Sequence, residues 1–291
     1  MNDTKDLKEI VRDKYAEIAE QSTEDNQASC CGAGGCSTEV YNIMTDDYSQ
    51  VKGYQKEADL GLGCGLPTQF AQIQPGDTVI DLGSGAGNDC FVARQETGES
   101  GKVIGIDFTD AMISKARQNA DKLSFNNVEF RHGDIDDMPV ADNNADVIVS
   151  NCVLNLVPDK QKVIAEIFRT LKPGGHFSIS DIVLEGELPK ALKEDAEMYA
   201  GCVAGAIQKS VYLKFIADAG FKTITVQKEK PINIPGDILS NYLNNEEAEN
   251  FGKSGSGIFS VTVFGQKPGG ENVESTVEKQ NAACTPGGGC C

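Results

Sequence analysis

Cysteine is the residue type in this sequence whose number most clearly suggests chemistry. The 291 residues include ten cysteines, two histidines (His132 and His176) and no tryptophan. Sulfur ligands favour soft metals and metalloids, and two histidines are too few for a site that needs several imidazoles. The composition therefore predicts metal or metalloid ligation, or redox chemistry, in place of the disulfide scaffold expected for a secreted chain.

The cysteines fall into two terminal clusters and four isolated positions. The clusters are Cys30, Cys31 and Cys36 near the N-terminus, and Cys284, Cys290 and Cys291 at the other end; the isolated positions are Cys64, Cys90, Cys152 and Cys202. Neither cluster has the two Cys-x2–4-Cys pairs that are usual in a structural zinc site. A lone cysteine is most often a small buried apolar residue, and we expect that role for Cys90.

A second motif with chemical meaning is a glycine-rich turn after a short apolar run. It reads Gly83-Ser84-Gly85-Ala86-Gly87, and Asp107 follows its last glycine by 20 residues, at the end of the next apolar run. Glycines let the backbone approach a ligand, and a carboxylate at this distance is placed to accept both ribose hydroxyls of an adenine nucleoside. The Gly-x-Gly-x-Gly spacing differs from the Gly-x-Gly-x-x-Gly fingerprint of nicotinamide-dependent dehydrogenases. Asp134, after a third run, is placed to bind the exocyclic amine of adenine.

Alternating strands and helices must position these residues. Apolar strand patterns occur at 78–82, 102–107, 128–130, 146–149 and 176–181, with helical patterns at 110–121 and 159–171 between them. This alternation predicts an α/β fold with parallel strands and right-handed crossovers, in which ligands bind beyond the carboxyl ends of the strands. We also expect an amphipathic helix at 1–20 and two late strands at 223–226 and 258–264.

Four motifs in this order resemble the class I S-adenosylmethionine-dependent methyltransferases. They are Asp81-Leu82-Gly83-Ser84-Gly85-Ala86-Gly87, Ile106-Asp107, Gly133-Asp134 and Arg169-Thr170-Leu171-Lys172-Pro173-Gly174-Gly175. The resemblance implies a Rossmann-like, doubly wound, mostly parallel seven-stranded sheet with an appended α+β substrate-binding region. It also implies S-adenosylmethionine as methyl donor, bound through Asp81, Gly83, Ser84, Gly85, Gly87, Asp107, Met112, Asp134, Ile135 and Asn151.

Three cysteine motifs resemble, more narrowly, the arsenite S-adenosylmethionine methyltransferases. They are Ser150-Asn151-Cys152, Gly201-Cys202-Val203 and Gly63-Cys64-Gly65, and with them the similarity extends over most of residues 30–265. The resemblance implies that Cys64, Cys152 and Cys202 are catalytic thiols that together bind trivalent arsenic. It further implies a fourth catalytic cysteine, near the N-terminus, that pairs with Cys64 during turnover. We assign that role to Cys36, with Cys30 and Cys31 as alternatives.

The chemistry of arsenic fits this choice of residues. Trivalent arsenic prefers sulfur donors, and three thiolates leave its lone pair free to attack the methyl group of the sulfonium. The family implies a thiol reductant such as glutathione or thioredoxin, and trivalent arsenic supplied free or as thiol conjugates. Two questions stay open. The terminal clusters either capture As(III) or are incidental. The function has two rivals, a methyltransferase that acts on a small organic molecule and a protein that sequesters a metalloid without catalysis.

Charge and composition bound the partners and the organisation. The net charge of −18 repels phosphate backbones and anionic membrane surfaces, so neither nucleic acid nor a membrane is expected as a partner. The N-terminus lacks the basic and apolar segments of a secretory signal, which predicts a cytoplasmic location. We expect four regions: an N-terminal helix, cysteine-rich loop and covering segment (1–70), a cofactor-binding domain (71–185), a substrate region with the last strands (186–267) and a flexible cysteine-containing tail (268–291).

Overall fold

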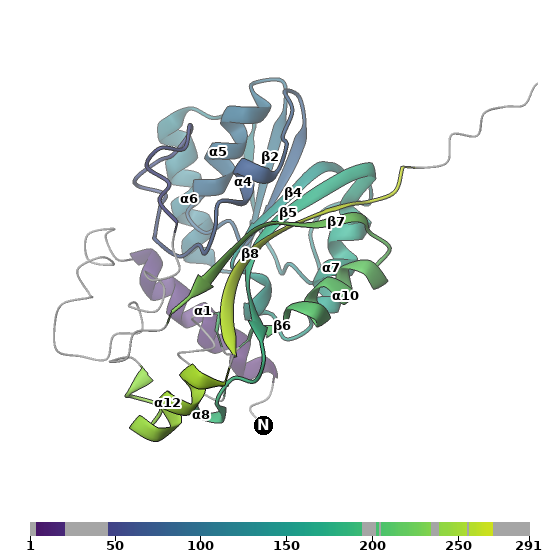
Figure 1. The fold of residues 1–291 in the computed structure, drawn as a ribbon. Helices are drawn as coiled ribbons and strands as arrows, with labels where there is room; N and C mark the ends of the chain where they lie inside the picture. The colour runs from purple at the N-terminus through teal and green to yellow at the C-terminus, as the bar shows by residue number, and fades with distance from the viewer. Residues whose placement is uncertain are drawn as a thin grey trace, which may run out of the picture.

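One mixed sheet forms the centre of the molecule (Figure 1). The computed structural model describes residues 4–20, 46–193, 202–203, 205–233, 239–254 and 256–269. The strands lie in the order β3-β2-β1-β4-β5-β8-β7, and a short β6 pairs with β5. Their bounds are β1 Thr78–Leu82, β2 Lys102–Asp107, β3 Val128–His132, β4 Ala145–Asn151, β5 Leu171–Glu185, β6 Ile207–Gln208, β7 Lys222–Ile232 and β8 Gly257–Gln266.

The first five strands and β6 run parallel, whereas β8 is antiparallel to both β5 and β7. The expected doubly wound, mostly parallel α/β sheet is therefore confirmed, with its seven long strands. The two-residue β6 is an eighth strand that the sequence did not predict, because two residues are too few to show a periodic pattern.

Helices cover both faces of the sheet. α5 (Asn88–Thr97) and α6 (Asp110–Leu123) pack on one face, and α7 (Lys160–Thr170) and α10 (Lys209–Asp218) pack on the other. Successive side chains of a strand point to opposite faces, so in β1 Val79 packs with the α5 and α6 side while Ile80 packs with the α7 and α10 side. This two-sided burial explains why the strands read as continuous apolar runs.

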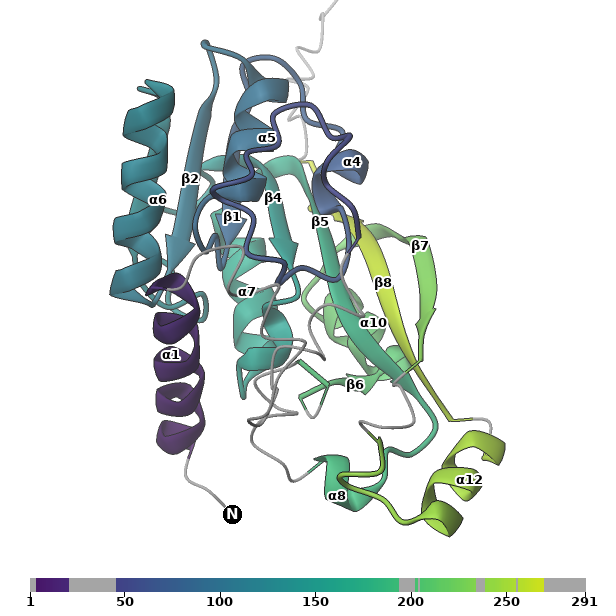
Figure 2. The ribbon, with the colours of Figure 1, turned by 90° about the vertical axis from the view of Figure 1, so that its left-hand side faces the viewer.

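Smaller elements surround this core. α1 (Thr4–Glu20) lies beside α6, as Figure 2 shows, with Ile18 and Ala19 packed against Met112 of α6. α4 (Pro67–Phe70) and the 3-10 helix η2 (Leu154–Leu156) flank the sheet, and α8 (Lys190–Lys193) and α12 (Asn245–Lys253) lie at the far end of β5 and β8 (Figure 1). Within the described residues, no helix is long and apolar enough to span a membrane.

The register of the parallel strands places three chemical residues at one edge. Leu82, the last residue of β1, pairs with Ile106 of β2 and with Ser150 of β4. The residues that follow each of these positions, Gly83, Asp107 and Asn151, therefore emerge side by side at the carboxyl ends of the strands, where ligands bind in open α/β sheets.

Candidate active site

The glycine-rich turn after β1 is held against the acidic residue that ends β2. Asp107 accepts hydrogen bonds from the backbone N–H of Gly85 (3.0 Å) and of Thr109 (2.8 Å). At Gly83, with a φ of 65°, a Cβ atom would lie 2.5 Å from the side chain of Val153. Only glycine tolerates both this left-handed backbone and this contact, so the residue lets the loop after β4 approach the turn.

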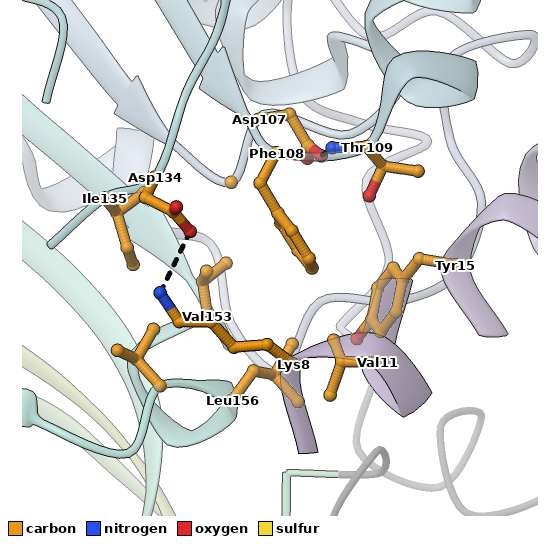
Figure 3. Close-up of a pocket in the computed structure, with 12 residues that line it drawn as sticks. Lys8, Val11, Tyr15, Asp107, Phe108, Thr109, Asp134, Ile135, Val153 and Leu156 are labelled. Carbon is orange, nitrogen blue, oxygen red and sulfur yellow. Dashed lines mark hydrogen bonds and ion pairs between the residues drawn. The ribbon is translucent and has the colours of Figure 1, made fainter. Parts of the chain in front are cut away.

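Two adjoining hollows lie over this edge of the sheet and share Tyr15, Gly83, Asp107 and Val153. The first, which we call the outer pocket, is mostly apolar and is drawn in Figure 3; Phe108, Asp134, Ile135 and Leu156 also line it. The second, the inner pocket, is lined with more polar groups, including Asp81, Ser84, Asn88, Asp89, Asn151 and Cys152.

Helix α1 forms one wall of the outer pocket. Figure 3 shows Lys8, Val11 and Tyr15 of this helix facing the side chains that follow β2 and β3. The Lys8 ammonium contacts Asp134 at 3.1 Å and Asp136 at 3.3 Å. Helix α1, which is far from β3 in the sequence, therefore completes the pocket. Its Lys8 pairs with Asp134, the residue that we expected to bind adenine.

Two buried polar side chains that line the inner pocket are available to bind a ligand. The buried Ser84 Oγ and Asn88 Oδ1 have no hydrogen-bond partner within the described part of the chain. Burial also raises the pKa of Asp81 well above its ordinary value and that of Asp89 to about 6. Unpaired polar atoms beside two buried carboxylates fit a polar ligand with a positive charge, such as the amino-acid end of S-adenosylmethionine.

Three of the predicted thiols come together beside the inner pocket. Cys152 follows β4 and lines the pocket, and the Cys202 thiol donates to the Cys152 carbonyl oxygen at 2.9 Å. Cys64 is fully buried, and its backbone N–H donates to Asn151 Oδ1 at 3.0 Å. Sequence segments separated by more than 130 residues therefore supply thiols to one place.

Burial and mutual contact affect the pKa values of Cys64 and Cys152. The pKa of Cys152 lies well above its ordinary value because its thiol hydrogen-bonds with the Cys202 and Cys64 thiols, and burial raises it further. Burial is also the main cause that raises the pKa of Cys64. Among the described residues, no group of three or more His, Cys, Asp or Glu side chains is arranged to hold a metal ion. The thiols meet at Cys152, and a single bound atom would have to draw Cys64 and Cys202 closer around it.

Comparison with known proteins identifies the family. Residues 73–220 match the methyltransferase domain family. An arsenite methyltransferase of Halobacterium salinarum is 39% identical in an alignment 279 residues long that covers 91% of this chain and 68% of the relative. That of Aquipseudomonas alcaligenes is 33% identical and matches 81% of this chain and 68% of its own length. This chain belongs to the arsenite methyltransferase family.

A solved structure agrees with this assignment. The crystal structure of an arsenic(III) S-adenosylmethionine methyltransferase from Chlamydomonas reinhardtii superposes with a TM-score of 0.61 and 29% identity, over 82% of this chain and 76% of that one. The family and fold predicted from the sequence motifs are therefore confirmed.

The remaining predicted site residues lie in different places. Gly87 precedes α5 with a φ of 99° and does not line either pocket, and Met112 is buried between α6 and α1. Cys90 lies on α5 and is buried in the core, as its isolated position predicted. Cys36 and the other cysteines of both terminal clusters lie outside the described residues.

Several pocket residues of this arsenite methyltransferase were not predicted from the sequence. Tyr15, Tyr48 and Asp59 lie in segments that carry no cofactor motif, and Phe108 directly follows the predicted Asp107. Asp89 had a usable signal, because it lies in the first turn of the helix after the glycine-rich turn. An acidic residue there is also common in ordinary helices, where it favours the helix dipole.

Proposed function

We propose that this chain transfers methyl groups from S-adenosylmethionine to trivalent arsenic held by the thiols of Cys64, Cys152 and Cys202. The observation that carries the proposal is the meeting of three buried thiols at the inner pocket, with Cys152 in its wall. The named relatives support it, because they are arsenite methyltransferases that match most of this chain.

The two pockets together suit the methyl donor. We assign the ribose hydroxyls to Asp107 and the adenine amine to Asp134, with Ile135 against the base, all in the outer pocket. The amino-acid end fits the inner pocket, where Asp81, Asp89 and the unpaired Ser84 hydroxyl lie. When bound, S-adenosylmethionine supplies an electrophilic methyl group on a positively charged sulfur.

Protonated thiols suit a neutral arsenic substrate. Arsenous acid, As(OH)3, reacts with three thiols to form three S–As bonds, and each thiol proton leaves with a hydroxide as water. The exchange buries no net charge, so it needs no resident base, and thiols whose pKa values are raised by burial can take part. The arsenic lone pair is then the nucleophile, and the protein catalyses by holding it in line with the methyl group.

Other parts of the proposal rest on the family resemblance and the sequence. Cys36, with Cys30 and Cys31 as alternatives, pairs with Cys64 during turnover, and glutathione or thioredoxin restores the thiols. The terminal clusters capture As(III), and the enzyme works in the cytoplasm. We also keep the division at residues 70, 185 and 267, although β7 and β8 of the third region complete the sheet of the second.

Transfer of a labelled methyl group to arsenite tests the proposal. Cys152→Ser should lower the rate of arsenic methylation by roughly 100-fold or more, because the arsenic loses one of its three positioning bonds. Its affinity for S-adenosylhomocysteine should stay within about twofold of the original, since the substitution is nearly isosteric. Cys90→Ser is the matched control, because that thiol is also buried and lies outside the thiol group, and a serine hydroxyl keeps its donation to Asp81 (3.2 Å).

Each rival function predicts a different result. A methyltransferase of small organic molecules would leave arsenite unlabelled and would turn over equally well with Cys152→Ser. A sequestering protein would bind arsenite, with about three thiols protected from titration, but would form no methylated arsenic. Unimpaired arsenic methylation by Cys152→Ser would remove Cys152 from the site.

A further inference from the structure

The Asn151 side chain links the loop that carries Cys64 to the inner pocket. Its Oδ1 accepts hydrogen bonds from the backbone N–H of Cys64 (3.0 Å) and of Gly65 (3.3 Å). Its Nδ2 donates to the carbonyl oxygen of Gly65 at 2.9 Å and to the Tyr48 hydroxyl at 2.6 Å. Because both backbone N–H groups can only donate, the orientation of this amide is fixed by its surroundings.

From Asn151 the chain of hydrogen bonds continues to a carboxylate. The Tyr48 hydroxyl accepts from Asn151 and has one proton to donate, and it lies 2.8 Å and 2.9 Å from the two oxygens of Asp89. An unbroken path therefore runs from the Cys64 N–H through Asn151 and Tyr48 to Asp89, and Asn151 Nδ2 also donates directly to Asp89 Oδ2 over a longer distance of 3.2 Å. Hydrogen bonds in such a buried chain polarise and strengthen one another.

The Cys64 loop has little room to move independently of this path. A Cβ atom on Gly63 would collide with the Asn151 amide, and one on Gly65 would lie 2.5 Å from Ser180 Oγ of β5. The Ser260 hydroxyl of β8 donates to the Cys64 carbonyl oxygen at 2.5 Å. The loop is thus wedged between the end of β4 and the neighbouring strands, and the amide of Asn151 sets its position.

At its other end, the path meets the part of the pocket that fits a cation. Asp81 and Asp89 are both buried and line the inner pocket, and after burial itself the charge of Asp89 is the next largest cause that raises the pKa of Asp81. An ammonium group bound beside them relieves this repulsion and holds Asp89 in one position. Ordering of Asp89 then orders Tyr48 and Asn151, and hence the backbone of Cys64.

We infer that Asn151 and Tyr48 are positioning residues that couple the methionine end of the cofactor pocket to the arsenic-binding thiol of Cys64. Binding of the cofactor thereby prepares the third thiol, so that the cofactor and arsenite each tighten the binding of the other. The inference rests on the proposed function, since it takes Cys64 as an arsenic ligand. Asn151, which we expected to contact the cofactor, acts in this scheme mainly through Tyr48 and Cys64.

Calorimetric titration with arsenite tests this coupling without any turnover. The full chain, reduced with a phosphine in place of a thiol, is titrated alone, with S-adenosylhomocysteine and with adenosine. S-adenosylhomocysteine should tighten arsenite binding by about 10-fold, within the usual range of coupling energies, and arsenite should tighten its binding by the same factor. Adenosine lacks the methionine ammonium and should leave the arsenite affinity unchanged.

Tyr48→Phe removes the hydroxyl at the centre of the path and leaves only the longer direct contact between Asn151 and Asp89 (3.2 Å). In this variant the effect of S-adenosylhomocysteine on arsenite affinity should fall to within about twofold, while the chain still binds each ligand alone. Thr97→Val is the matched control: it removes another buried hydroxyl, which bonds to the Asp77 carbonyl oxygen near the far end of α5, and it should keep the coupling.

The outcomes separate this inference from the proposed function. Full coupling in Tyr48→Phe, or arsenite binding by the unaltered chain with no response to S-adenosylhomocysteine, would overturn the inference and leave the function standing. Absence of arsenite binding by the unaltered chain would overturn the proposed function and the inference together.

Discussion

At the scale of single residues, the backbone of two proposed arsenic ligands is unusual. Cys152 has a φ of 63° and Cys202 a φ of 65°, a left-handed conformation that is uncommon outside glycine. The conformation at Cys152 is held by its own N–H, which donates to the Ser180 carbonyl oxygen at 2.8 Å. Strain of this kind gathers at functional sites, where surrounding contacts keep a side chain in a direction it would not otherwise take. Four other non-glycine residues in the described part of the chain share this conformation, Gln72, Ser124, Asn143 and Thr223, but they line neither pocket, whereas both cysteines present thiols at the site.

Asp181 of β5 is a second costly residue near the thiols. It is completely buried, and its carboxylate accepts from the Ile182 N–H at 2.9 Å, with the Tyr212 hydroxyl 3.5 Å away. Burial raises its pKa from 3.8 to about 7, against the opposing effect of Lys160. The folded state therefore binds the proton more tightly than the unfolded state, so Asp181 favours folding below pH 4 and loses that contribution as the pH rises through 7.

Asp181→Asn should accordingly stabilise the fold at high pH. The gain in the free energy of unfolding should be near zero at pH 4 and grow to on the order of 3 kcal/mol above pH 7, because the amide mimics the neutral acid. Urea unfolding at several pH values measures this gain. Asp121→Asn, an exposed change on α6, is the control and should show no such growth. An equal gain at pH 5 and pH 8 would show that Asp181 does not change its protonation across this range.

Sequence spacing predicted residues that line the pockets, such as Asp107 and Cys152, but it also predicted Gly87, which lines neither of them. Asp107 follows from its distance to the glycine-rich turn, and Cys152 from its place after a strand. Tyr48 could not be predicted, because it lies in a segment without strong periodicity and tertiary packing alone brings it to the inner pocket, beside Asn151 and Asp89. The contact between Cys152 and Cys202 is equally invisible to spacing, since it depends on tertiary packing across 50 residues.

At the scale of elements, α1 shows how a peripheral helix can control a pocket. Its apolar residues Val11 and Ile18 are buried, so packing fixes the helix in place. Its Lys8 then completes the outer pocket through Asp134 and Asp136. About a third of the Lys8 side chain is exposed, which limits what this ion pair can contribute.

Lys8→Met should weaken cofactor binding modestly and in a salt-dependent way. Loss of the charge should raise the Kd of S-adenosylhomocysteine by about two- to fivefold at low ionic strength, as expected for a partly exposed pair. The difference in Kd should largely disappear near 0.5 M salt. The Debye length falls from roughly 10 Å at 0.1 M salt to roughly 3 Å at 1 M, so the ions then screen such a pair. Arg12→Met is the control: Arg12 is on the same helix, about half exposed, and pairs with its neighbour Asp13. A salt-independent loss in Lys8→Met would indicate that its stem, and not its charge, shapes the pocket.

The elements themselves were predicted best where both faces are buried. β1 and β2 match the apolar runs that predicted them at both ends, and β4 extends one residue before and two residues beyond its predicted 146–149. β7 extends from Lys222 to Ile232, well beyond the predicted 223–226, because its charged residues hide the strand and pairing with β8 maintains it. β5 begins at Leu171, directly after α7, although the Pro-Gly-Gly sequence there indicated a break.

At the scale of the whole molecule, the acidic composition suits a neutral substrate. A net charge of −18 repels arsenate and other anions, whereas uncharged arsenous acid approaches without an electrostatic barrier. Electrostatic attraction cannot concentrate an uncharged substrate near the active site. Thiols outside the site can raise the local concentration of arsenous acid by binding it. Under the proposed function, this is the role of Cys284, Cys290 and Cys291, which the methyl transfer itself does not require.

Removal of residues 270–291 should therefore affect capture and leave catalysis intact. The described fold ends at residue 269, and Lys267, whose ammonium donates to the Phe168 and Leu171 carbonyl oxygens at 2.7 Å, is retained. The kcat for methylation should be unchanged. The KM for arsenite should rise about several-fold, because the tail no longer raises the local concentration of arsenite at the active site. Steady-state rates at limiting and saturating arsenite measure both quantities. Replacing Cys284, Cys290 and Cys291 with serine in the full-length chain tests the thiols while keeping the tail. If sulfur captures the arsenic, the truncation and the triple substitution should raise KM by the same factor. If neither change alters KM, the C-terminal cysteines take no part in delivering arsenic.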